Sequence, residues 1–97
     1  MAQVVYSENA LTNLERAFEF LSDHDPTAAR KAAVAISEAV AMLARHPLIG
    51  RVVKGELREL VISFGRTGYI ALYRFLPLAD EVRILAIRHQ RELDYPY

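Results

Sequence analysis

The sequence lacks several residues on which common classes of protein depend. There is no cysteine among its 97 residues, which excludes disulfide frameworks and thiolate metal sites. Its three histidines are scattered, and their spacing matches no zinc motif. We therefore expect no metal and no other cofactor.

An excess of charge of one sign is also missing. Twelve Lys and Arg residues balance twelve Asp and Glu residues, whereas nucleic-acid-binding domains usually carry a basic excess. Residues 1–50 hold four basic and six acidic side chains, and residues 51–97 hold eight basic and six acidic ones. The only positive bias is therefore a small one in the second half.

Long apolar runs are absent too. No stretch approaches the roughly 20 residues that a membrane-spanning helix needs, and the first residues have no basic segment of a signal peptide. We expect no membrane association and a cytoplasmic protein. The hydrophobic fraction of 53% with 25% charged residues is typical of a globular chain, and 97 residues fit one domain over residues 1–97.

The first half of the chain is typical of one strand followed by two helices. Residues 3–6 favour a strand and end at Ser7, a good helix N-cap. In residues 8–22, apolar side chains recur every three or four positions and predict a helix whose buried stripe consists of Leu11, Leu14, Phe18 and Leu21. Pro26 suits the first turn of a second helix, predicted over residues 26–45. The short break between them predicts a helical hairpin.

Three strands are predicted in the second half, over residues 57–64, 69–76 and 81–89, after a connector at residues 48–56. The short loops between them imply antiparallel hairpins. The third strand is apolar on both sides, which predicts a central strand, with the strand at residues 3–6 beside it. The predicted fold is α+β, in the order β-α-α-β-β-β, with the helical hairpin packed on one face of a small, mostly antiparallel sheet.

Two helices cover only one face of such a sheet. Alternation places Tyr69, Tyr73 and Phe75 on the reverse side of their strand from Ile70 and Leu72. We expect this aromatic face to be left bare by the helices and to receive a partner.

The familiar catalytic motifs are absent: no phosphate-binding glycine loop, Gly-x-Ser-x-Gly or His-Glu-x-x-His occurs. The informative residues are arginines near strand ends, interleaved with aromatic side chains: Arg58, Arg66, Arg74, Arg83, Arg88, Arg91, Tyr69, Tyr73, Phe75, His89 and Tyr95. Guanidinium groups match phosphate or carboxylate oxygens and rings stack on bases, so this mixture suits a polyanion or an acidic peptide. The same residues also suit an ordinary solvated surface.

His89 stands between Arg88 and Arg91. Neighbouring cations favour the neutral imidazole, which suits a general base. A neutral hydrogen-bonding role explains the position equally well.

Four segments occur in the order that toxins of the RelE/ParE superfamily show, namely residues 45–51, 57–60, 68–74 and 84–92. The chain resembles that superfamily over nearly its whole length. The resemblance implies the fold predicted above, assembly with a cognate antitoxin that neutralises the toxin through a segment that folds on binding, and a role such as plasmid stabilisation.

The superfamily divides by target: RelE-like members cut mRNA in the ribosome, and ParE-like members poison DNA gyrase. RelE-like toxins place an arginine directly after the Gly-Tyr of the middle strand, where this chain has Ile70. The chain also has only two lysines, Lys31 and Lys54, and its ending at residues 88–92 is closer to the ParE side. The resemblance therefore favours a gyrase inhibitor that catalyses no reaction.

Two alternatives stay open. As a ribosome-dependent endoribonuclease, the chain would use His89, Arg91, Arg58, Arg74 and Tyr95 as its catalytic set. As a non-toxic relative, it would only bind the antitoxin. Outside a catalytic role, we expect Tyr69, Tyr73, Phe75, Arg66 and Arg88 to bind the target or the antitoxin.

Overall fold

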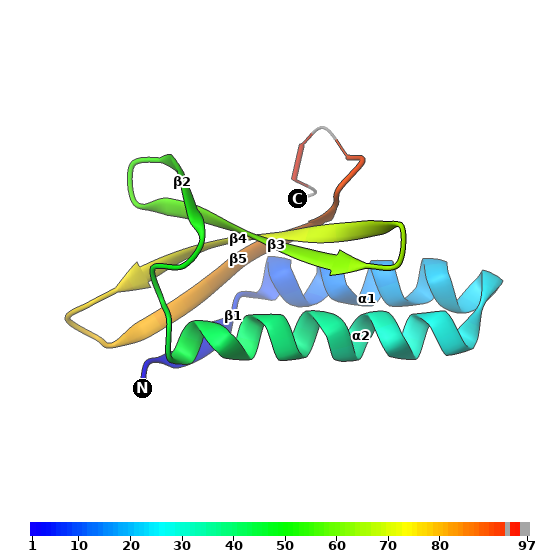
Figure 1. Ribbon diagram of the computed structural model, residues 1–97, viewed down its shortest axis with the longest axis horizontal. Coiled ribbons are helices and arrows are strands. Elements are labelled where there is room, and N and C mark those ends of the chain that lie inside the picture. The colour runs from blue at the N-terminus through cyan, green and yellow to red at the C-terminus, as the bar shows by residue number, and fades with distance from the viewer. Residues whose placement is uncertain (93, 96–97) are drawn as a thin grey trace.

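A five-stranded sheet with one layer of helices makes up the computed structural model, which describes residues 1–92, 94 and 95 (Figure 1). In chain order the elements are β1 (Gln3–Tyr6), α1 (Glu8–His24), α2 (Pro26–Ala41), the 3₁₀ turn η1 (Met42–Ala44), β2 (Arg51–Lys54), β3 (Leu57–Phe64), β4 (Thr67–Leu76) and β5 (Glu81–His89). The α+β fold predicted from the sequence is confirmed, with one additional strand, β2.

Both helices of the hairpin begin at side-chain caps. The Ser7 hydroxyl accepts a hydrogen bond from the Ala10 N–H at 3.0 Å, and the Asp25 carboxylate accepts one from the Ala28 N–H at 3.1 Å. The second helix ends at Ala41 instead of residue 45 and continues only as η1. A proline at position 47 disfavours helical conformation just before it, so the last turn tightens and the chain leaves the helix.

The buried stripe of α1 differs from the predicted one. Leu14 and Leu21 pack against the core, but Leu11 and Phe18 are 50% and 43% exposed. Ala10 and Asn13 are the buried residues of this helix. Small side chains let α1 approach β5 closely, which turns the two larger residues toward the groove between the helices.

The strand order is β1-β5-β4-β3-β2, with β1 parallel to β5 and every other pair antiparallel. The prediction that β5 is an interior strand with β1 beside it is confirmed, although the middle strand of the five is β4. The edge strand β2 falls in the predicted connector. It has only four residues, Arg-Val-Val-Lys, with no alternation of apolar and polar side chains, so periodicity gives no strand signal there.

The aromatic side chains of β4 face the helices. Ile62 pairs with Tyr69 and Arg58 pairs with Tyr73 across β3 and β4, and Tyr69 and Tyr73 are 4% and 0% exposed. The prediction of a bare aromatic face is therefore wrong. Alternation shows which residues of one strand share a face, but the register across the turn decides which face of β3 lies beside which face of β4. A turn with an even number of residues between these strands pairs even-numbered residues of β3 with odd-numbered residues of β4.

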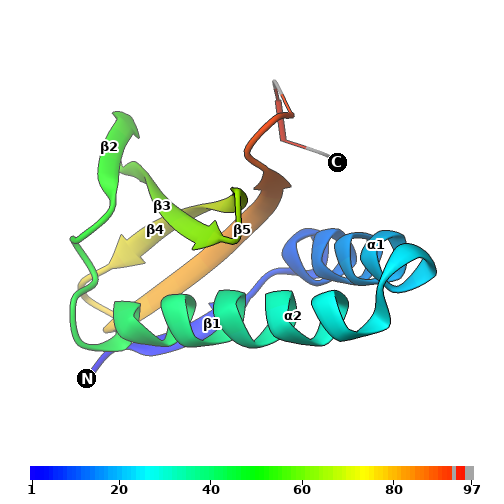
Figure 2. The same cartoon turned by 45° about the vertical axis from the view of Figure 1, so that its right-hand side comes forward.

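The helices cover one face of the sheet only, while β2 and the C-terminal residues rise from the other (Figures 1 and 2). We call this other face the open face. The core between helices and sheet includes Val40, Leu43, Tyr73, Val82 and Ile84, all essentially inaccessible to solvent. Over residues 1–92, 94 and 95, neither helix is both long and apolar enough to cross a bilayer, and no three acidic or histidine side chains gather as they would around a metal ion.

Candidate functional site

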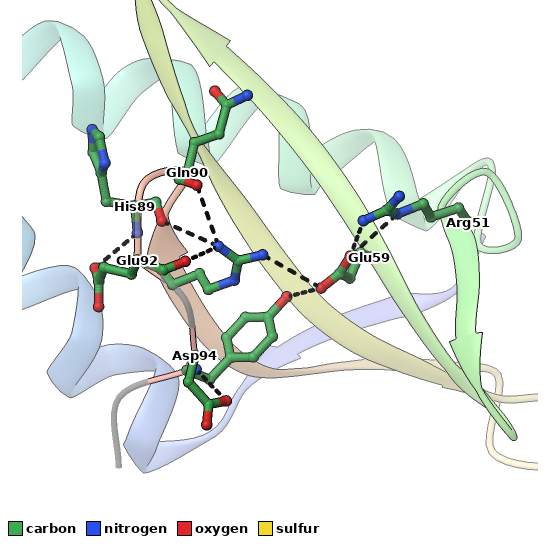
Figure 3. Close-up of polar contacts among 8 residues, drawn as sticks. Arg51, Glu59, His89, Gln90, Glu92 and Asp94 are labelled. Atoms are coloured by element: carbon green, nitrogen blue, oxygen red, sulfur yellow. Dashed lines mark hydrogen bonds and ion pairs between the residues drawn. The ribbon is translucent and has the colours of Figure 1, made fainter.

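A buried carboxylate on the open face joins three other side chains. Glu59 of β3 is 7% exposed. Arg51 of β2 donates to its Oε1 from Nη2 at 2.7 Å and from Nε at 3.2 Å, and the Tyr95 hydroxyl donates to its Oε2 at 2.6 Å. The guanidinium of Arg88 lies 4.0 Å from the same Oε2 (Figure 3). We call these four residues the Glu59 cluster.

Electrostatics keep the Glu59 carboxylate ionised. Burial raises the pKa of Glu59, but the bond from Tyr95 and the positive charges of Arg51 and Arg88 outweigh it, so the pKa lies below its ordinary value. Burial and the neighbouring Glu59 raise the pKa of Tyr95 well above that of a free tyrosine. Tyr95 therefore stays protonated and donates to the carboxylate.

Arg88 organises the residues that follow β5. Its side chain is 14% exposed. Nη1 donates to the carbonyl oxygen of Glu92 and, at 3.4 Å each, to those of His89 and Gln90, while the guanidinium lies over the Tyr95 ring, 5.1 Å from its centre. Arg88 thus holds residues 89–92 and Tyr95, which we call the C-terminal segment, onto the sheet. The Glu92 carboxylate adds a second contact by accepting a hydrogen bond from the His89 N–H at 2.9 Å.

His89 lies on the opposite face from Arg88, where both of its ring nitrogens are engaged. Nε2 is 2.8 Å from the Thr67 hydroxyl, and Nδ1 accepts the Arg91 N–H at 3.1 Å. The ring also contacts Tyr69 edge-on, with ring centres 5.5 Å apart. A proton on Nε2 satisfies both contacts, so the ring is used as a structural link.

The other residues of the candidate nuclease set lie elsewhere. Arg58 donates to the carbonyl oxygens of Leu48 and Gly50 at 3.0 and 2.9 Å. It pairs with Tyr73, four residues along β4 from the partner of His89, which offsets the two residues by about 13 Å along the strand direction, on opposite sides of β4. Arg74 is on the open face and pairs with Glu56 at 3.1 Å.

Of the five candidate catalytic residues, only Tyr95 joins the Glu59 cluster; His89 and Arg91 are neighbours on the far side, and Arg58 and Arg74 are separate. Among the expected partner-binding residues, Arg66 is exposed in the β3–β4 turn and Phe75 is partly buried against the core. Arg88, as described above, is committed to the C-terminal segment.

A cleft of about 640 Å³ opens between α1 and the end of β5. It is lined by Asn13, Arg16, Ala17, Phe20, Tyr69, Ile87, Arg88, His89, Arg91 and Glu92. The contributions of Asn13, Arg16 and Phe20 were not foreseen from the sequence. One signal was present: Asn13 is a polar residue beside the predicted apolar stripe of α1, where a hydrophobic side chain would be ordinary.

Comparison with known proteins identifies the family. Residues 4–94 match the family model described as the ParE toxin of the type II toxin-antitoxin system parDE. The chain belongs to this family. The match spans nearly the whole fold, including the cleft and every member of the Glu59 cluster except Tyr95, and it confirms the RelE/ParE resemblance seen in the sequence.

Other members of the RelE/ParE group are similar over nearly their full length. Toxin RelE3 of Caulobacter vibrioides is 36% identical over 92 residues, covering 95% of this chain and 98% of the relative. Toxin RelE2 of the same organism is 35% identical and toxin RelE1 is 32% identical, covering 96% and 92% of this chain and 100% and 94% of the relatives.

A solved structure described as a chromosomal ParDE toxin-antitoxin system from P. aeruginosa has the same fold. The TM-score is 0.73 at 22% identity, and the match covers 92% of this chain and 96% of the other. As a ParE-family toxin, the chain is the toxin component of a type II toxin-antitoxin system.

Proposed function

We propose that this ParE-family toxin arrests growth by inhibiting DNA gyrase and catalyses no reaction of its own. The observation that carries the proposal is the dispersal of the nuclease set. Metal-free RNA cleavage needs a base, an acid and cations around one phosphate. Both nitrogens of His89 are engaged, and Arg58 and Arg74 are held by the connector and by Glu56.

The balance of charge supports the same conclusion. A toxin that cuts mRNA on the ribosome works against a dense phosphate surface, for which clustered Lys and Arg residues supply affinity. Twelve basic side chains here are offset by twelve acidic ones. Three of the arginines expected at an RNA surface, Arg74, Arg83 and Arg88, are paired with or adjacent to carboxylates.

A supercoiling assay with purified gyrase tests the proposal. The purified toxin is expected to lower the supercoiling of relaxed plasmid in a dose-dependent way, and addition of the co-encoded antitoxin is expected to restore it. Full supercoiling at a molar excess of toxin would overturn the proposal. A chain that also leaves growth unaffected when expressed alone would be the non-toxic relative.

Ribosome-dependent mRNA cleavage is the second candidate, favoured by the names of the three Caulobacter relatives, all described as RelE toxins. Mapping of transcript ends after induction separates the two. New ends inside translated messages would assign the chain to the nucleases, and unchanged ends with lost supercoiling would assign it to gyrase. Either target places the toxin in the cytoplasm, where we propose that it acts.

A further inference from the structure

We propose that the cleft between α1 and the end of β5 binds a carboxylate side chain of a protein partner, seated beside an apolar side chain of the same segment. The inference is independent of the gyrase proposal, because it concerns what the cleft binds and not what the toxin inhibits.

Hydrogen-bond donors without acceptors meet at this cleft. Asn13 is 4% exposed, and its Nδ2 amide makes no hydrogen bond within the described chain. The guanidinium groups of Arg16 and Arg91 also form no ion pair or hydrogen bond with any residue that the structure describes. A buried donor without an acceptor is costly, so a ligand that supplies an acceptor here gains affinity.

The orientation of the Asn13 amide is fixed by its other half. Oδ1 accepts the Ile87 N–H at 2.9 Å, because β1 pairs with β5 only up to Ile84 and leaves the following part of this edge to side chains. Turning the amide over would place its NH₂ against that N–H. Nδ2 is therefore held as a donor, and it is not free to become an acceptor.

Arg91 is held at the rim of the cleft by the ties that fasten the C-terminal segment. Its N–H donates to His89, whose ring is fixed by Thr67. The residue after it, Glu92, is tied to the His89 N–H and to Arg88. A cation on a fastened segment loses less conformational freedom on binding than one on a free end.

The charges around the cleft favour an anion. Arg16 and Arg91 line it, against the single carboxylate of Glu92. Arg88 also lines it, but its guanidinium is already bound to backbone carbonyl groups on the open face and lies near Glu59. The Glu92 carboxylate already accepts the His89 N–H, which leaves it less able to neutralise the arginines. The donors of the site match the acceptor oxygens of a carboxylate.

The floor indicates a protein segment and not a nucleic acid. Ala17, Phe20 and Ile87 line the cleft, and Phe20 is 68% exposed, with its ring next to that of His24. A phosphate backbone gains nothing from contact with these apolar side chains, whereas an aliphatic side chain next to the carboxylate of a protein ligand buries them. The expected ligand is therefore an acidic residue flanked by apolar ones.

The Asn13 side-chain amide provides a direct reporter. The ¹⁵N-labelled toxin is titrated with acetyl-Leu-Glu-Leu-amide, with the matched acetyl-Leu-Gln-Leu-amide and with inorganic phosphate, and the Asn13 NH₂ resonances are followed. Charge-assisted hydrogen bonds are stronger than neutral ones, so the Glu peptide is expected to bind about ten-fold or more tightly than the Gln peptide. Phosphate is expected to shift these resonances only weakly.

Variants at the rim complete the test without disturbing the fold. Arg16→Gln combined with Arg91→Gln is expected to abolish the preference for Glu over Gln, because it removes the two positive charges that would bind the carboxylate. Both side chains are exposed and bind nothing within the described chain, so the fold is expected to be unchanged. Arg30→Gln, an exposed arginine of α2 outside the cleft, is the matched control and is expected to retain it. Equal affinity for the two peptides, an unmoved Asn13 amide, or phosphate binding as tightly as the Glu peptide would each overturn the proposal.

Discussion

The hydroxyl of Tyr73 fixes the connector before β2 to the sheet through a single polar atom. The ring is fully buried, and its oxygen accepts the N–H of Gly50 at 2.8 Å. Gly50 approaches so closely that a Cβ there would lie 2.6 Å from the ring. The connector before β2 is thus pinned to β4 by one buried hydrogen bond, with Arg58 holding the adjacent carbonyl groups.

Removing that hydroxyl leaves a buried N–H without an acceptor. Tyr73→Phe is expected to lower the free energy of unfolding by about 1–3 kcal/mol, as measured by urea denaturation. Tyr69→Phe is the matched control, since that hydroxyl bonds to no described residue, and a change within about 0.5 kcal/mol is expected. Equal effects in the two variants would show that the bond to Gly50 contributes nothing.

The carboxylate of Glu59 makes stability depend on pH. Its pKa in the folded chain lies below the ordinary value of 4.5, so its stabilising contribution is complete above that pH and is lost as pH falls through the folded pKa. Glu59→Gln removes the titrating group. The stability gap between wild type and variant, measured by denaturation from neutral pH downward, is expected to narrow below about pH 4.5. A gap that stays constant into strong acid would contradict the assignment.

At the scale of elements, α1 also serves as a cover for the free edge of β5. The Ser7 hydroxyl donates to the carbonyl oxygen of Leu85 at 3.0 Å, Asn9 donates to the same oxygen at 3.1 Å, and Asn13 accepts from Ile87. An uncovered strand edge invites pairing with another chain. The polar side chains of Ser7, Asn9 and Asn13 therefore satisfy the backbone groups of β5 that a longer β1 would otherwise pair with.

Ser7 is the sharpest test of this arrangement because one hydroxyl caps the helix and the strand at once. Ser7→Ala is expected to cost about 1–2 kcal/mol of stability and to speed hydrogen exchange in the first turn of α1. Ser37→Ala, at an exposed position of α2, is expected to be neutral or slightly stabilising. Equal changes in the free energy of unfolding for the two variants would show that the Ser7 cap does not stabilise the protein.

Prediction from the sequence succeeded where a signal is local. Capping residues located both helix starts, and the glycine of the β3–β4 turn, at φ +60° in Gly65, marked the hairpin. The prediction failed where the information is relational. The register of β3 on β4 and the pairing of β2 depend on partners distant in the chain, and so do the acceptors that Arg58 and Arg88 find in carbonyl groups. Glu59 and Asn13 were missed for the same reason.

The whole molecule is electrically balanced, and its arginines are largely used within the chain. Nonspecific DNA affinity grows with the number of phosphates that a protein neutralises. We expect this toxin to bind a short fluorescent DNA duplex more weakly than about 10⁻⁴ M at physiological salt, as measured by anisotropy. Micromolar binding that falls steeply with added salt would show that a basic surface exists and would revive the RNA-directed candidate.

The position of β5 between β1 and β4 governs the order in which the toxin can be made. This strand follows every other strand in the sequence, yet it lies inside the sheet, where it pairs with β1 and β4 and packs against α1. During synthesis, α1 can pack against α2, but β1 and the sheet-facing side of α1 have no β5 to contact until that strand leaves the ribosome. A half-made toxin therefore has neither its core nor its cleft, and the cell meets the active molecule only when translation of β5 is complete.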